Sequence, residues 1–133
     1  MRIMDETNTL YEMANFGTNT TGEPFTIWVD EAGKDRKTKH DLPRFKVEKS
    51  NIQLDIVIEP NGTVRFDKQN TSKLHKFGPY KDALKFVEKF KPALLMHWNK
   101  EIETGDLALI MKLVSKKKYS VEDAIEATLN DDF

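Results

Sequence analysis

The spacing of apolar residues changes near residue 80, and this change restricts the fold more than any other feature of the chain. Before residue 80, apolar and polar residues alternate in short segments, as in Phe25, Ile27 and Val29 or in Phe45 and Val47. Strict alternation places every second side chain on one face of a β-strand. We therefore expect strands over residues 25–29, 44–48, 52–58 and 64–66, each with one apolar face.

After residue 80, apolar residues recur every three or four positions, which is the period of an amphipathic helix. The first stripe comprises Ala83, Val87, Phe90, Leu94 and Trp98. Pro92 interrupts the stripe without shifting its phase, so either one helix kinks there or Pro92 begins a second helix. A further helix is expected after Gly105, and a last one after the capping pattern Ser120-Val121-Glu122-Asp123.

Strands followed by helices predict an α+β fold, in which a small antiparallel sheet of about four strands packs on C-terminal helices. A chain of 133 residues fits one domain. Within it we expect an N-terminal arm over residues 1–23, helical or extended, the sheet over 24–68 and helices over 79–130. Residues 67–79 are expected to form a basic, polar linker. Asn61 and Gly62 predict a hairpin, because Asn-Gly readily adopts the two positive φ angles of a type I′ turn.

The composition excludes several classes of protein. The chain has no cysteine, which excludes disulfides, cysteine metal sites and cysteine nucleophiles. The N-terminal residues lack the apolar stretch of a secretion signal, and no apolar run is long enough to span a bilayer. We therefore expect a cytoplasmic protein that needs no membrane and no cofactor.

The net charge of −1 conceals a segregation of charge along the chain. Residues 34–91 contain fifteen Lys and Arg against eight Asp and Glu, whereas residues 1–33 and 92–133 together contain six against fourteen. Such segregation does nothing for the fold itself, but it favours contact with a polyanion or with a protein of complementary charge. Acidic termini around a basic middle also allow association between copies of the chain.

The basic segment contains the residues that we expect to bind a partner. They are Lys34, Arg36, Lys37, Lys39 and His40 in one loop, Arg44 and Lys46 on the strand that follows, Arg65 on the hairpin, and Trp28 as an exposed aromatic beside these cations. Cations combined with an aromatic on a sheet are typical of proteins that hold single-stranded nucleic acid. The sequence pI of about 6.3 is lower than that of most nucleic-acid-binding domains, however, and an aromatic ribonucleoprotein signature is missing.

Motifs for metal binding or catalysis are weak. The histidines His40, His75 and His97 lie too far apart in sequence for one element to supply two metal ligands. His97 precedes Glu101 by four residues, which predicts an exposed pair on one helix. Outward-facing acids such as Asp55, Glu59 and Asp67 are expected to be solvated, and no hydrolase or nucleotide-binding motif is present.

Residues 40–47, His40-Asp41-Leu42-Pro43-Arg44-Phe45-Lys46-Val47, resemble the His-x-Pro-Pro-His-Phe-His-Val signature of a small bacterial family of domains of unknown function. The hairpin that follows and the helix ending in Leu94-Leu95-Met96-His97-Trp98 are also similar, so the resemblance covers about residues 24–100. His40, Pro43, Phe45, Val47 and Trp98 match, whereas Arg44 and Lys46 replace two of the family's histidines. The resemblance implies that a partner is encoded beside the chain, as in toxin–antitoxin pairs.

Two hypotheses follow from the sequence. The first is a small non-enzymatic interaction or regulatory module from a toxin–antitoxin or phage and mobile-element setting, including anti-defence, whose basic loop and strand face bind an acidic protein. The alternative is a nucleic-acid-binding protein that uses the same face. A hydrolytic enzyme ranks third, because no catalytic constellation assembles from the sequence.

Overall fold

The structure, a computed structural model, describes residues 2–4, 10–35 and 42–131. Its strands are β1 (Arg2–Met4), β2 (Leu10–Phe16), β3 (Thr26–Asp30), β4 (Arg44–Lys49), β5 (Ile52–Ile58) and β6 (Val64–Phe66). Its α-helices are α1 (Thr18–Thr21), α2 (Thr71–Phe77), α3 (Tyr80–Trp98), α4 (Thr104–Lys117) and α5 (Val121–Leu129). A short 3₁₀ helix, η1 (Gly33–Asp35), follows β3.

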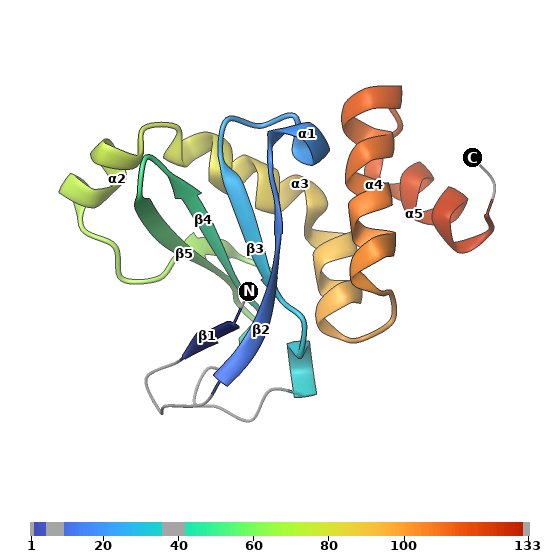
Figure 1. The fold of residues 1–133 in the computed structure, drawn as a ribbon, viewed down its shortest axis with the longest axis horizontal. Coiled ribbons are helices and arrows are strands. Elements are labelled where there is room, and N and C mark those ends of the chain that lie inside the picture. Colours follow the sequence, from blue (N-terminus) through green and yellow to red (C-terminus); the bar gives the residue numbers. More distant parts are fainter. Residues whose placement is uncertain (1, 5–9, 36–41, 132–133) are drawn as a thin grey trace.

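The strands form one antiparallel sheet in the order of the sequence, from β1 to β6. Strands β2 to β6 pair continuously, and β1 pairs with the first half of β2. Helix α3 lies across one face of the sheet, α2 lies at one end, and α4 and α5 lie at the other (Figure 1). The predicted α+β class is confirmed.

Of the two forms expected for the N-terminal arm over residues 1–23, the extended one occurs at residues 10–16. Residues 10–16 form β2, whose second half pairs with β3, so the sheet is larger than the four strands expected. Residues 18–21, also within the expected arm, form α1, which ends at Gly22 with φ 76°. The alternation in β2 is irregular in sequence, and its role as a strand depends on pairing with β3.

The predicted type of turn at Asn61 and Gly62 is wrong. The hairpin at Asn61 and Gly62 is confirmed, but only Gly62 has a positive φ, of 90°. Pro60 precedes Asn61 and suits the first central position of a type I turn, so Gly62 takes the left-handed position that follows. The two consecutive positive φ angles of a type I′ turn occur instead at Ser50 and Asn51, 53° and 65°, between β4 and β5.

The helices begin and end largely where local signals predict. Ser120 caps α5, with its hydroxyl oxygen accepting from the backbone N–H of Asp123 at 3.1 Å. Helix α3 continues through Pro92, which is exposed, as a single helix. The expected linker over 67–79 is wrong, because it contains α2, capped by the Asn70 side chain and anchored by buried Phe77.

The core lies between the sheet and the helices. The inward faces of β3, β4 and β5 bury Ile27, Val47, Leu54 and other alternating residues, as predicted. Opposite them, α3 buries its predicted stripe, and α4 and α5 add Leu107, Met111 and Ala124 among others. None of the helices in the described part of the chain combines the length and apolarity needed to cross a membrane.

Candidate interaction surface

The outward face of the sheet collects the strand cations that the sequence singles out. Alternation turns Arg44 and Lys46 on β4 away from the core, and register places Arg44 opposite Val57 and Lys46 opposite Asp55 on β5. Arg65 on β6 lies on the other side of Val57. Directly opposed side chains lie close together, so the stems of both arginines flank Val57, which is only 1% exposed.

Each of these three cations is paired with a carboxylate. Arg44 donates to Asp67 at 2.6 Å and lies 3.7 Å from Asp55, to which Lys46 donates at 2.9 Å. Arg65 pairs with Glu59 and lies 3.8 Å from Asp67. The hydrogen bond from Arg44 holds the pKa of the Asp67 carboxyl below its usual 3.8, and the positive charges of Arg44, Arg65 and Lys68 act in the same direction.

This pairing neutralises the outward face of the central sheet. Residues 44–67 contain four Lys and Arg and four Asp and Glu, so the segment has no net charge. A polyanion would have to compete with these carboxylates for Arg44, Lys46 and Arg65. The sheet face is therefore a poor source of attraction for an acidic partner, in contrast to the sequence-based expectation.

The expectation of an exposed aromatic at Trp28 is wrong. Trp28 is only 9% exposed, and its indole N–H donates to the Glu48 carboxylate at 3.3 Å. Its neighbours on the same face include Asn15 on β2 and Lys46 on β4, which lie directly opposite it. Because stacking on a base requires an open ring face, Trp28 in this position offers no platform for nucleic acid.

The basic loop is described only at its beginning. Lys34 is exposed in η1, whereas Arg36, Lys37, Lys39 and His40 lie outside the described residues. Gly33 fixes the start of the loop against the end of α3: it has φ 55°, and a Cβ there would lie 2.3 Å from the carbonyl oxygen of Trp98. Only glycine allows this close approach.

The positive surplus of residues 34–91 lies mainly on helices. Residues 71–91 contain six lysines against two acids, whereas the sheet segment is neutral. Lys81, Lys85 and Lys89 recur every four residues on the exposed side of α3, and we call them the α3 lysine row. Within the described part of the chain, no carboxylate forms an ion pair with any member of the row.

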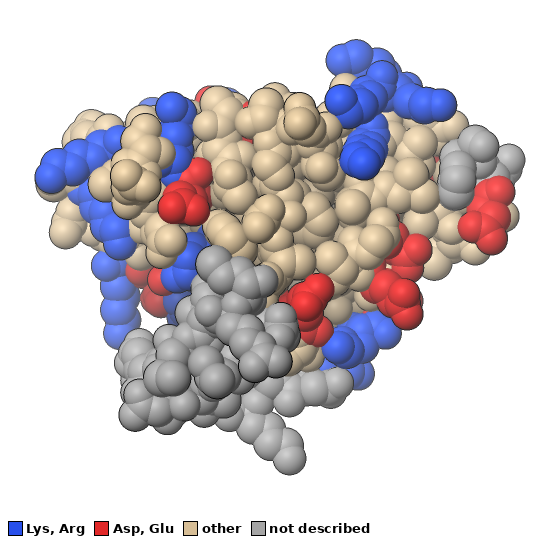
Figure 2. All heavy atoms as spheres, viewed as in Figure 1, with Lys and Arg blue, Asp and Glu red and all other residues tan. Residues whose placement is uncertain are grey.

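The face visible in Figure 2 shows where charges gather on the surface. Lys and Arg lie over α2 and the neighbouring strand ends on one side, and over the C-terminal end of α4 on the other. The area between them is largely uncharged. A further group lies at the lower edge of the view, and the separate groups of cations do not form one basic surface on this face.

A buried polar cluster joins β3, α3 and α4, and sequence reasoning missed it. His97 is 4% exposed, and its Nε2 lies 2.9 Å from the Thr104 hydroxyl, which donates to Glu31 at 3.2 Å. Because the single hydroxyl proton goes to Glu31, Nε2 of His97 donates to Thr104. Lys100 donates to the backbone oxygen of Glu31 at 2.8 Å. These residues line a cavity of about 270 Å³ together with Ile102 and Glu103.

The predicted pair of His97 with Glu101 is wrong. Helix α3 ends at Trp98, and the chain reverses through Lys100, whose φ is 64°, so Glu101 is exposed and its N–H donates to the Met96 carbonyl. Burial lowers the pKa of His97 below its usual 6.5, and the positive charge of Lys100 lowers it further against Glu31 and Asp30. The position of His97 in phase with Phe90 and Leu94 could have indicated its burial, but not its partner.

The weak signals for metal binding in the sequence concern three histidines, of which His75 and His97 lie in the described residues. Among them, no three His, Asp or Glu side chains lie close enough together to hold a metal ion. The cluster at His97 consists of a neutral imidazole, a hydroxyl and a carboxylate that bond to one another, which joins three elements of the fold.

Comparison of the chain with protein-family models, with curated proteins and with solved structures finds no match. The family resemblance therefore stays a prediction. Three of the residues that carry it, Phe45, Val47 and Trp98, are buried. At these positions the resemblance follows the demands of core packing.

Proposed function

We propose that the protein is a non-enzymatic interaction module that binds an acidic protein partner through the α3 lysine row. The single observation that carries the proposal is the difference in pairing between the two sets of cations. Those on the sheet are bonded to carboxylates within the chain, whereas Lys81, Lys85 and Lys89 are exposed and have no such partner in the described residues.

The geometry of α3 supports this role. A separation of four residues along a helix corresponds to a rise of about 6 Å, so the row presents three cations over about 12 Å. Asp82 and Glu88 are also exposed on α3, but Lys91 pairs with Glu88 at 3.0 Å. Even with Glu23, whose carboxylate interacts with Lys89 and Asp82, the exposed side of the helix keeps a positive surplus that would accelerate encounter with an acidic surface.

The buried position of Trp28 favours a protein partner over nucleic acid, because the aromatic component of the nucleic-acid hypothesis is not exposed. The setting implied by the family resemblance, with a cognate partner encoded beside the chain, belongs to the proposal. The proposal also includes a second set of charges, the loop residues Arg36, Lys37 and Lys39, which the sequence predicts to bind the partner.

The experiment compares two triple variants with the same change of charge. A tagged K81E/K85E/K89E protein and a tagged K68E/K73E/K76E control are each used to capture proteins from a lysate of the source organism. We expect the first variant to lose the acidic partner that the unmodified chain captures and the control to retain it. A K→E variant that still shows the native circular dichroism spectrum and captures the same proteins as the unmodified chain would contradict the proposal.

Two further arms identify the partner class and the loop's part in binding. Capture is repeated after nuclease treatment, and binding of a labelled single-stranded oligonucleotide is measured at 50 mM salt. If capture is lost after nuclease treatment and the oligonucleotide binds, the partner is nucleic acid and not an acidic protein. An R36E/K37E/K39E variant shows whether the loop contributes, because the lysine row is unchanged in it.

A further inference from the structure

The C-terminal helical hairpin has opposite charges on its two helices. Exposed Lys112, Lys116, Lys117 and Lys118 lie on α4 and at its C-terminal cap, and we call them the α4 lysine cluster. Exposed Glu122, Asp123, Glu126 and Asp131 lie on α5 and directly after it, and we call them the α5 acidic face. The two sets are equal in number and opposite in sign, so residues 112–131 carry no net charge.

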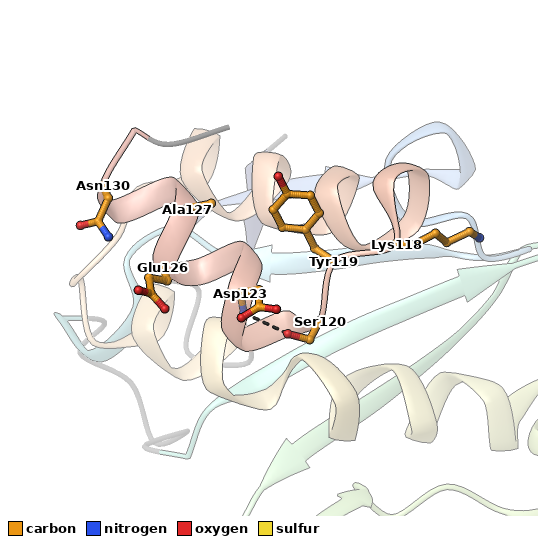
Figure 3. Close-up of a pocket in the computed structure, with 7 residues that line it drawn as sticks. All are labelled: Lys118, Tyr119, Ser120, Asp123, Glu126, Ala127 and Asn130. Carbon is orange, nitrogen blue, oxygen red and sulfur yellow. Dashed lines mark hydrogen bonds between the residues drawn. The ribbon is translucent and has the colours of Figure 1, made fainter.

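These charges do not neutralise one another within the chain. Among the described residues, no ion pair joins the α4 lysine cluster to the α5 acidic face. Lys118 ends α4 with φ 61°. Figure 3 shows its side chain pointing away from Glu126 and Asn130 on α5. Both sets of charges are therefore available to another molecule.

Stabilisation of the individual helices explains only part of this arrangement. Lys116 and Lys117 in the last turn of α4, and Glu122 and Asp123 in the first turn of α5, lie where each helix dipole favours their charge. Glu126 and Asp131, however, lie towards the C-terminal end of α5, where the dipole disfavours a carboxylate. The stability of α5 therefore gives no reason for the acidic charge at that end.

An apolar side chain lies between these two acids. Leu129 is 57% exposed, and no other large hydrophobic residue is exposed among those whose side chains the structure describes. A shallow groove of about 570 Å³ runs between the end of α4 and α5, lined by Tyr119, Asp123, Glu126 and Asn130 among others, and Leu129 does not line it. A single exposed leucine is ordinary on a protein surface, so the unpaired, opposite charges of α4 and α5 are what make this end of the molecule suited to a contact.

We propose that this surface binds a second copy of the chain in a two-fold symmetric dimer. In that arrangement the α4 lysine cluster of each copy faces the α5 acidic face of the other, so one patch supplies both halves of the contact. The equal and opposite charges are complementary to themselves after a two-fold rotation. The two copies of Leu129 provide the apolar part of the contact. This surface is distinct from the α3 lysine row, and the inference does not depend on the proposed function.

The dimer is tested with two variants that change charge without opposing the helix dipole of α5. E126K/D131K makes the α5 acidic face neutral, and K112E/K116E makes the α4 lysine cluster neutral. Sedimentation velocity at 20–500 µM protein measures self-association of each variant in 50 mM and 500 mM salt. We expect the unmodified chain to dimerise at low salt, with an association constant that falls at least about tenfold at high salt.

The mixture of the two variants gives the decisive result. Each variant alone is expected to associate at least about tenfold more weakly than the unmodified chain, because no fully charged cluster meets a fully charged face. An equimolar mixture restores one complete contact, between the intact α4 lysine cluster of one variant and the intact α5 acidic face of the other. The mixture should therefore form a 1:1 dimer that neither variant forms alone.

Two controls separate the contact from general effects of charge and folding. K81E/K85E carries the same charge change as K112E/K116E but on α3, and it should dimerise as the unmodified chain does. L129N carries no charge change and should weaken dimerisation severalfold while keeping its salt dependence. A monomeric unmodified chain at 500 µM in low salt, or a mixture that associates no better than its components, would overturn the inference.

Discussion

The contact between Gly33 and the end of α3 gives a sharp prediction about how the start of the basic loop is held. Replacement of Gly33 by alanine adds one carbon that would lie 2.3 Å from the carbonyl oxygen of Trp98 and 3.0 Å from its carbonyl carbon. Both atoms belong to the backbone of a helix end and cannot rotate away. The loop, or the last turn of α3, must therefore move.

The magnitude has two parts. Gly33 has φ 55°, and an L-residue in the left-handed region costs about 1–2 kcal/mol. Forcing an extra carbon into a filled position costs about 1–3 kcal/mol beyond the backbone term. The neighbouring His97 cluster adds to the effect, because Glu31 lies two residues before Gly33 and would shift with it.

Gly22 supplies a matched control. It also has a positive φ, of 76°, but a Cβ there would meet only Ser115 Cβ, at the ordinary distance of 3.5 Å. G22A therefore carries the backbone cost without the overlap. The difference between G33A and G22A isolates the contact with Trp98.

Urea denaturation followed by far-ultraviolet circular dichroism measures the free energy of unfolding of both variants. We expect G33A to be about 1–3 kcal/mol less stable than G22A. In thermal unfolding this corresponds to a midpoint lower by roughly 3–10 °C for a domain of this size. Equal stability of the two variants would refute the conclusion that Gly33 is required by the approach of η1 to α3.

Three other predictions concern the polar contacts. Because burial lowers the pKa of His97 below its usual 6.5, the unfolded state takes up a proton at this residue more readily than the folded state, so this contribution to stability is complete well above pH 6.5 and is lost as the pH falls through and below that value. In urea denaturation at a series of pH values, H97Q should flatten this dependence, and an unchanged pH dependence would contradict the burial of His97 as its cause. The hydrogen bond from Arg44, which lowers the pKa of Asp67 below its usual 3.8, stabilises the fold above that pH, and the stabilisation diminishes as the pH falls below it. D67N should therefore cost about 0.5–1 kcal/mol at pH 7 and less at pH 2, and an undiminished difference at pH 2 would contradict the Arg44 pairing. Trp28 is buried and its indole N–H donates to Glu48, so its fluorescence should not change when an oligonucleotide is added. A W98F background removes the signal of the other tryptophan, and strong quenching would show that the Trp28 indole is accessible for stacking.

The local periods were sufficient to predict β3 to β6 and the helices α3 and α5. Each of these elements has one buried face, and a buried face imposes its own period on the sequence, as in Ile27 and Val29 or Phe90 and Leu94. Capping is equally local, because Ser120 and Asp123 are three residues apart. The existence and type of these elements required only neighbours within one turn or one strand, and these predictions were confirmed.

The sequence was less informative where one signal competed with another or where a segment depended on a distant partner. Pro60 determined the turn at Asn61 and Gly62, while a type I′ turn formed at Ser50 and Asn51 without glycine. Strand β2 carries an irregular pattern and gains its hydrogen bonds from β3. Helix α2 is short, and its apolar residues could be assigned only when Phe77 was seen in contact with Phe25.

The amino-acid sequence alone determined the α+β class, the core residues and the uneven distribution of charge, because each of these is set by composition or by spacing along the chain. Tertiary structure alone decided which charges are available for binding. Arg44 and Asp67 are 23 positions apart, and His97 reaches Thr104 and Glu31 only after the chain has turned back on itself. Ion pairs and hydrogen bonds act over a few ångströms, so they depend on strand register and helix placement, which no local pattern encodes.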